Sequence, residues 1–67
     1  MPLVTVTITR EGATPAQKAR IIQGVTQLLV DVLGKNPATT HVIIEEIDAD
    51  SWGIAGEPVT TRRLRGE

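Results

Sequence analysis

Residues 14–34 read TPAQKARIIQGVTQLLVDVLG, and this stretch decides the fold because it predicts one long amphipathic helix. Thr14 suits the N-cap, Pro15 suits the first helical position, and Gln17 completes a capping box. Gly34 suits the C-cap. The apolar residues between them recur at the i, i+3, i+4, i+7 spacing of a helix with one buried face; they are Ile21, Ile22, Val25, Leu28, Leu29, Val32 and Leu33.

A β-strand is expected on each side of this helix. Residues 3–9, LVTVTIT, alternate apolar residues with threonine, which is the period-2 pattern of a strand. Residues 41–47, HVIIEEI, are the second strand, and two strands joined by a helix of this length pair in parallel. Gly53, Gly56 and Pro58 then indicate a small hairpin. The sequence therefore predicts an α+β fold: a single βαβ unit with parallel strands and a C-terminal β-hairpin.

The length of the chain indicates how this fold is stabilised. The chain has 67 residues, so we expect one domain over residues 1–67. A monomer of this size buries only about 60% of its unfolded surface and usually needs disulfides, a metal or oligomerisation. The second strand places Ile43 and Ile47 on the face opposite Val42 and Ile44, and one helix covers only one face. We therefore predict a homo-oligomer in which another subunit covers the second face.

Composition excludes several classes of function. The chain has no cysteine and one histidine, which excludes disulfides and argues against a metal site. The formal net charge is −1 and Trp52 is the only aromatic residue, so we expect no nucleic-acid partner. No apolar run approaches the roughly 20 residues of a membrane span, and a strand pattern begins where a signal peptide would lie. We expect a cytoplasmic protein with no membrane partner.

Pro2 is the strongest candidate for chemistry. Met1 before a residue as small as proline is normally removed in the cell, which leaves a secondary amine at the start of the first strand. An ordinary α-amine has a pKa of about 7.7–8.0, and burial or a nearby cation lowers it. A modest shift gives a neutral amine at pH 7 that can act as a general base. The alternative is that proline simply begins an edge strand, where its missing N–H costs nothing.

These segments together resemble the 4-oxalocrotonate tautomerase family. The resemblance runs from Pro2 to about Arg63 and rests on the order and spacing of Met-Pro, an alternating strand, a Glu-Gly loop, a capped helix, Val-Ile-Ile-Glu-Glu and Trp-Gly-Ile-Ala-Gly-Glu. It implies a βαβ unit with a hairpin that assembles into dimers and then a hexamer. It also implies a keto–enol tautomerase without a cofactor, in which the Pro2 amine is the general acid and base for a small enol or unsaturated keto acid.

The resemblance assigns site residues individually. Pro2 matches the catalytic proline, and Trp52 matches the aromatic wall of the substrate pocket. Ile54 matches the apolar position after that wall, and Thr39 matches a small residue whose backbone contributes to the site. Without the resemblance, Trp52 is equally well explained as a buried core residue.

The substrate-binding arginines of the family are replaced here. His41 stands at the family arginine that begins the second strand, and Ala13 stands at the one after the Glu-Gly pair. A first loop that is one residue longer holds Arg10, so we take Arg10 and His41 as substrate-binding candidates. Each also has a structural reading, Arg10 as a solvated loop charge and His41 as a half-exposed interface residue. The basic tail is interpreted as a solvated end that can supply a cation; it contains Arg62, Arg63 and Arg65.

Two alternatives to an isomerase remain open. One is a relative that hydrates or dehalogenates a small unsaturated acid, although the Trp52-Gly53-Ile54 stretch lacks the carboxylate that would activate water. The other is an oligomer that binds a small ligand without catalysis, which the replacement of two arginines favours. Loss of guanidinium groups also predicts a preference for enols with one carboxylate over dicarboxylates.

Overall fold

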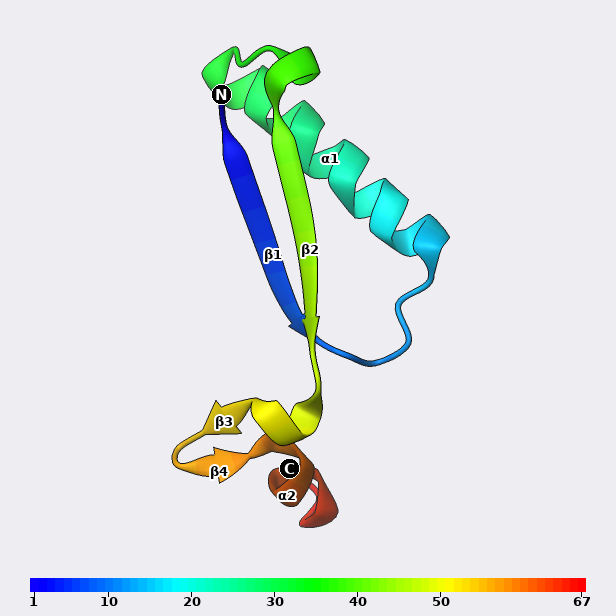
Figure 1. Ribbon diagram of the computed structural model, residues 1–67, viewed down its shortest axis with the longest axis vertical. Helices are drawn as coiled ribbons and strands as arrows, with labels where there is room; N and C mark the ends of the chain where they lie inside the picture. The colour runs from blue at the N-terminus through cyan, green and yellow to red at the C-terminus, as the bar shows by residue number, and fades with distance from the viewer.

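The computed structural model describes residues 1–67 and consists of a βαβ unit followed by a small C-terminal unit beyond one end of the strands (Figure 1). The βαβ unit comprises β1 (Leu3–Thr9), α1 (Pro15–Leu33), the 3-10 helix η1 (Pro37–Thr39) and β2 (His41–Ile47). The C-terminal unit comprises the 3-10 helix η2 (Ala49–Ser51), β3 (Gly53–Ile54), β4 (Glu57–Pro58) and α2 (Val59–Leu64). The predicted strands, central helix and hairpin are confirmed.

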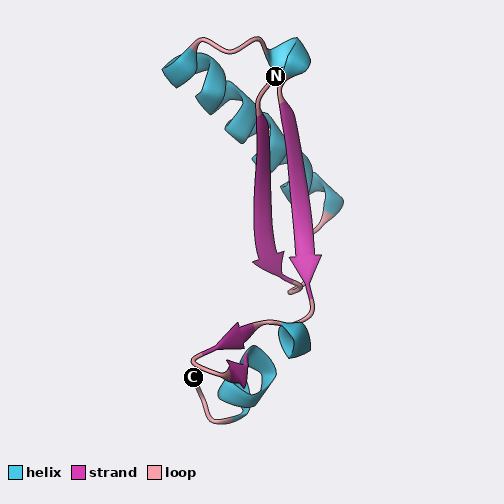
Figure 2. Ribbon diagram, turned by 60° about the vertical axis from the view of Figure 1, so that its left-hand side comes forward, coloured by secondary structure: helices cyan, strands magenta, loops and turns pink.

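The two long strands pair in parallel, as predicted. Their register runs from Leu3 opposite His41 to Thr9 opposite Ile47. The ladder continues past both ends, because His41 N–H donates to the Pro2 carbonyl at 2.9 Å and Arg10 N–H donates to the Ile47 carbonyl at 2.8 Å. Figure 2 shows the two strands side by side with α1 crossing behind them. The register thereby fixes which site residues lie at each end of the sheet.

Local signals set both ends of α1. The Thr14 hydroxyl accepts a hydrogen bond from Gln17 N–H at 3.1 Å, and Thr14 N–H donates to Gln17 Oε1 at 2.9 Å. This is the capping box that the sequence predicts. At the other end Gly34 has φ 64°, and its N–H donates to the Val30 carbonyl at 3.0 Å. A left-handed residue at this position favours glycine. The helix is not long and apolar enough to cross a membrane, and neither is any other helix of the chain.

Helix α1 covers one face of the strand pair. Val42 and Ile44 are half-buried, and the Glu46 side chain on the same face is 11% exposed and forms an ion pair with Lys18 of α1. On the opposite face Ile43 is 51% exposed. The alternation of the strand therefore places apolar side chains on both faces, and the chain itself covers only one of them.

The single chain leaves much of its apolar surface in water. Val59 is the only buried residue. The accessible surface is 4887 Å², whereas a compact monomer of this mass exposes roughly 4,100 Å². The radius of gyration is 15.3 Å, against about 11 Å for a compact domain of this length. Such an extended shape agrees with a subunit whose remaining apolar surface is covered by other chains.

The C-terminal unit contains a helix that the sequence did not predict. Ala55 and Gly56 form the two-residue turn between β3 and β4, with φ of 53° and 83°. Val59 N–H then donates to the Trp52 carbonyl at 2.7 Å and closes the unit. The first arginines of the basic tail, Arg62 and Arg63, lie in α2 and keep side chains that are 28% and 46% exposed. Both arginines form ion pairs with carboxylates of the same chain.

Candidate active site

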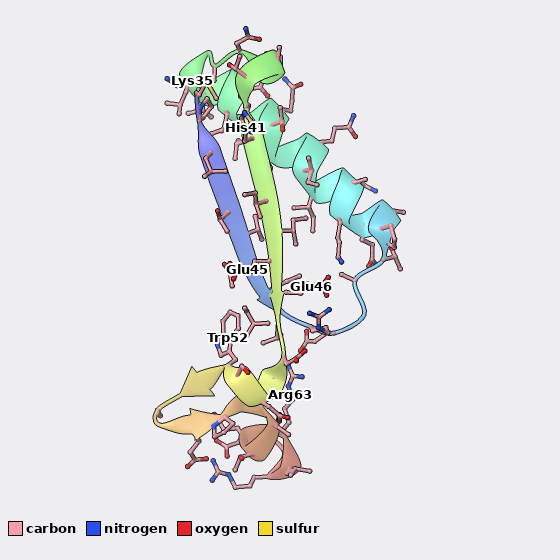
Figure 3. The ribbon with its side chains drawn as sticks, viewed as in Figure 1. Lys35, His41, Glu45, Glu46, Trp52 and Arg63 are labelled. Atoms are coloured by element: carbon pink, nitrogen blue, oxygen red, sulfur yellow. The ribbon has the colours of Figure 1, made fainter.

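The predicted site residues fall into two groups at opposite ends of the long strands. The proline group lies at the start of β1 and β2 and contains Pro2, Thr39 and His41. The arginine group lies beyond the ends of β1 and β2 and contains Arg10, Trp52 and Ile54. Figure 3 shows this separation through His41 and Trp52, which are labelled at opposite ends of the strands. Eight residue steps of a strand separate Pro2 from Arg10, which is about 26 Å. One chain therefore does not bring the predicted residues into one site.

The proline group is built on the first pairing of the strands. Pro2 is half-buried, and its carbonyl accepts the 2.9 Å hydrogen bond from His41 N–H. The loop before β2 is held by Asn36, whose Oδ1 accepts from Ala38 N–H at 2.9 Å. The Asn36 carbonyl accepts from the Thr40 hydroxyl at 2.8 Å. These hydrogen bonds hold η1 in place. Thr39, the last residue of η1, therefore lies at the same end of the strands as Pro2 and His41.

The arginine group is organised by one short segment of chain. Arg10 Nε donates to Asp48 Oδ1 at 2.8 Å, and its Nη2 donates to the Glu46 carbonyl at 3.4 Å. Asp48 precedes η2 and Trp52 follows it, so both residues belong to the same turn. The Trp52 ring is half-buried and lies by the ends of the strands (Figure 3). Ile54 is 46% exposed. Arg10, Trp52 and Ile54 thus lie at the same end of the long strands, where Asp48 holds the Arg10 guanidinium.

Most cations of the chain have a carboxylate partner. Arg63 forms an ion pair with Glu11, and Arg62 with Glu67 at 3.1 Å. Hydrogen bonds that Arg65 donates to the carboxylate of Glu57, and also to that of Glu67, raise the pKa of Arg65 above its ordinary value. The tail arginines are therefore engaged within their own chain, and none of them is free to supply a cation to the site without breaking a pair.

Two cations have no ion-pair partner. Arg20 borders a shallow depression of about 420 Å³ at the start of α1, which it shares with Ala13, Gln17 and Ile21. Lys35 follows the C-cap of α1 and lies at the same end of the molecule as His41 (Figure 3). The sequence analysis did not identify Lys35 as a cation at the end of the molecule where Pro2 lies. The available signal was its position, since the parallel pairing brings the end of α1 back to the start of β1.

Comparisons with known proteins give the family. A family model described as "Tautomerase enzyme" matches residues 2–62. "Probable tautomerase K2" of Dickeya dadantii is 64% identical over 63 residues, which cover 94% of this chain and 94% of that protein. The 2-hydroxymuconate tautomerase of Pseudomonas putida is 46% identical over 46 residues, which cover 69% of this chain and 73% of that protein.

A solved structure agrees in fold over nearly the whole chain. The crystal structure of TomN, a 4-oxalocrotonate tautomerase homologue of the tomaymycin biosynthetic pathway, superposes with a TM-score of 0.89 and 30% identity. The match covers 98% of this chain and 100% of TomN. Fold, family model and relatives therefore agree: the chain is a tautomerase-type isomerase and belongs to the 4-oxalocrotonate tautomerase family.

Proposed function

We propose that this protein tautomerises a small enol or unsaturated keto acid with the Pro2 amine as the general acid and base. The observation that carries the proposal is the position of Pro2, which is half-buried at the start of β1 in a chain of this family. While Met1 is attached, the Pro2 nitrogen is an amide and has no basicity. The activity therefore requires removal of Met1.

The site is proposed to form between subunits. The proline group of one chain meets the arginine group of another, because about 26 Å of strand separates them within one chain. The uncovered sheet face around Ile43 and the extended shape support assembly, and we propose a homohexamer. In this arrangement Trp52 and Ile54 of one subunit wall the pocket over Pro2 of a neighbour. Thr39 and His41 border the pocket from the side of Pro2.

The chemistry needs only proton transfers. The neutral Pro2 amine takes the proton from the enol hydroxyl, and the oxygen electron pair forms the carbonyl while the carbon–carbon double bond shifts. The Pro2 ammonium then returns the proton to carbon. Arg10 of a neighbouring subunit stabilises the negative charge that develops on oxygen. No cofactor takes part in either step.

The experiment is a direct assay on protein whose N-terminus is known. Intact mass establishes whether Met1 is gone, and ketonisation is followed by ultraviolet absorbance. The two substrates are 2-hydroxymuconate, a dicarboxylate, and phenylenolpyruvate, a monocarboxylate. We expect turnover of at least one of them by the processed chain and none by a chain that retains Met1. Equal activity of the two forms would refute the role of Pro2.

A second candidate is an oligomer that binds a small acid without catalysing its isomerisation. Its support is the replacement of two family arginines by Ala13 and His41, together with the pairing of Arg10 with Asp48. The same assay separates the candidates. Binding of an acid by processed protein that turns over neither enol would favour this second function.

A further inference from the structure

We propose that Asp48 determines the charge specificity of the site by holding and neutralising Arg10, so that the site takes enols with one carboxylate in preference to dicarboxylates. The inference rests on the proposed function, because it assumes that Arg10 binds the substrate. Asp48 is a positioning residue here, since it acts on the substrate through Arg10.

The first support is the geometry of the Arg10 guanidinium. Asp48 Oδ1 accepts from Nε at 2.8 Å, and the Glu46 carbonyl accepts from Nη2 at 3.4 Å. Both acceptors occupy the Nε side of the planar group. The donors of Nη1 have no partner within the chain, so the outer edge of the group is left for a ligand. The side chains of Arg10 and Asp48 are 59% and 68% exposed, so an incoming acid can reach this edge.

The second support is the balance of charge around the arginine group. Arg10 is paired with Asp48, and its chain neighbour Glu11 is paired with Arg63. Glu46, two residues before Asp48, is paired with Lys18. These three carboxylates are therefore compensated before a substrate binds, whereas Glu45 of β2 and Asp50 of η2 have no cation partner and leave this end of the sheet with excess negative charge. One substrate carboxylate can use the free edge of Arg10, whereas a second one adds a negative charge near Asp48 with no cation left to compensate it.

Three variants separate charge from position. Asp48→Asn keeps an oxygen that can accept from Arg10 Nε but removes the negative charge. Asp48→Ala removes both the charge and the acceptor. Asp31→Asn is the matched control, because Asp31 is an exposed α1 aspartate hydrogen-bonded to Gln27 and takes no part in the site. Sedimentation and circular dichroism confirm that each variant folds and assembles as the wild type does.

The decisive measurement is binding, followed through the fluorescence of the single tryptophan, Trp52. The probes are adipate, a saturated dicarboxylate, and hexanoate, its monocarboxylate counterpart. We expect Asp48→Asn to tighten adipate binding about three- to tenfold, because it removes one unit charge a few ångströms from a second carboxylate. Hexanoate binding should change less than about twofold, since its only carboxylate lies on the free edge of Arg10. Asp31→Asn should change neither.

The steady-state constants KM and kcat provide a second test. A merely structural role of Asp48 would not change them separately. Asp48→Asn should lower KM for 2-hydroxymuconate with kcat unchanged, whereas Asp48→Ala should lower kcat for both enols because Arg10 is no longer held. An unchanged adipate-to-hexanoate ratio in Asp48→Asn would overturn the proposal. So would a shift of the same size in an Arg10→Ala background, where Asp48 has nothing to act through. If the processed wild type turns over neither enol, the tautomerase proposal fails while the titration still decides the role of Asp48.

Discussion

Pro2 and Arg10 flank the same strand, β1, and lie at its opposite ends. The Pro2 carbonyl accepts from His41 N–H at the start of the ladder, and Arg10 N–H donates to the Ile47 carbonyl at its end. A strand of this length is stiff and fully extended, so no side-chain motion joins the two residues within one chain. A substrate that contacts both must lie between two subunits.

Replacing Pro2 should remove most of the catalytic power without unfolding the protein. Pro2→Ala, once Met1 is removed, leaves a primary amine with different basicity and a looser position. We expect kcat to fall by about 10²-fold, within the range that general acid–base groups contribute. Circular dichroism and sedimentation should match the wild type, since Pro2 precedes the first strand. Wild-type activity in Pro2→Ala with a verified N-terminus would contradict the mechanism.

Changes at the cationic positions should redirect specificity. Arg10→Ala should lower kcat/KM by about 10- to 100-fold, because each charge-assisted hydrogen bond contributes about 1.5–3 kcal/mol. The double change Ala13→Arg with His41→Arg should raise activity on 2-hydroxymuconate, since it restores guanidinium groups at both ends of the sheet. Steady-state kinetics with the two enols measures both effects. If Arg10→Ala leaves both rates unchanged, another cation binds the carboxylate, and Lys35 or a tail arginine becomes the candidate.

A charge on the uncovered sheet face should block assembly. Ile43 is 51% exposed in the single chain and points away from α1. Ile43→Asp should convert the oligomer to smaller species, because burying an unpaired carboxylate is strongly unfavourable. Sedimentation velocity at micromolar concentration measures the shift. Leu64→Asp is the control, since it adds the same charge at an apolar residue of α2, outside the sheet face. A hexamer that persists in Ile43→Asp would show that a different surface joins the subunits.

The hairpin turn offers a stabilising change. Ala55 has φ 53°, in the left-handed region that costs a residue with Cβ roughly 1–2 kcal/mol. Asparagine tolerates this region better and adds less freedom to the unfolded chain than glycine does. Ala55→Asn should therefore stabilise the protein by about 0.5–1 kcal/mol, and Ala55→Val should destabilise it by a similar amount or more. Urea unfolding at one fixed protein concentration measures both. A lower midpoint for Ala55→Asn would contradict this account of the turn.

Local signals explain why so much of the fold was predictable. Thr14, Gln17 and Gly34 set the ends of α1 through contacts within a few residues, and strand alternation is visible in the sequence. Helix α2 could not be predicted in this way. Its six residues lack an apolar repeat, and it depends on packing against η2 and β4 and on the ion pair between Arg63 and the distant Glu11.

The candidate site was predictable as a set of residues but not as an arrangement. Pro2, His41 and Trp52 could be named from their positions in the family pattern. Their distribution over two ends of the sheet depends on strand register and length, which the structure supplies. The pairing of Arg10 with Asp48 was also invisible in the sequence, because 38 positions separate the two residues. Charge balance of this kind depends on tertiary contacts rather than on local pattern.

The two-ended layout proposed for the site has a genetic consequence. A Pro2→Ala chain still has an intact arginine group, and an Arg10→Ala chain still has an intact proline group. When the two defective chains are co-expressed and mix at random in equal amounts, about one quarter of the sites combine two intact halves, because each site takes its two halves from different chains. Two inactive alleles should therefore complement each other. Chains that carry both substitutions, mixed with no other allele, should show no such rescue.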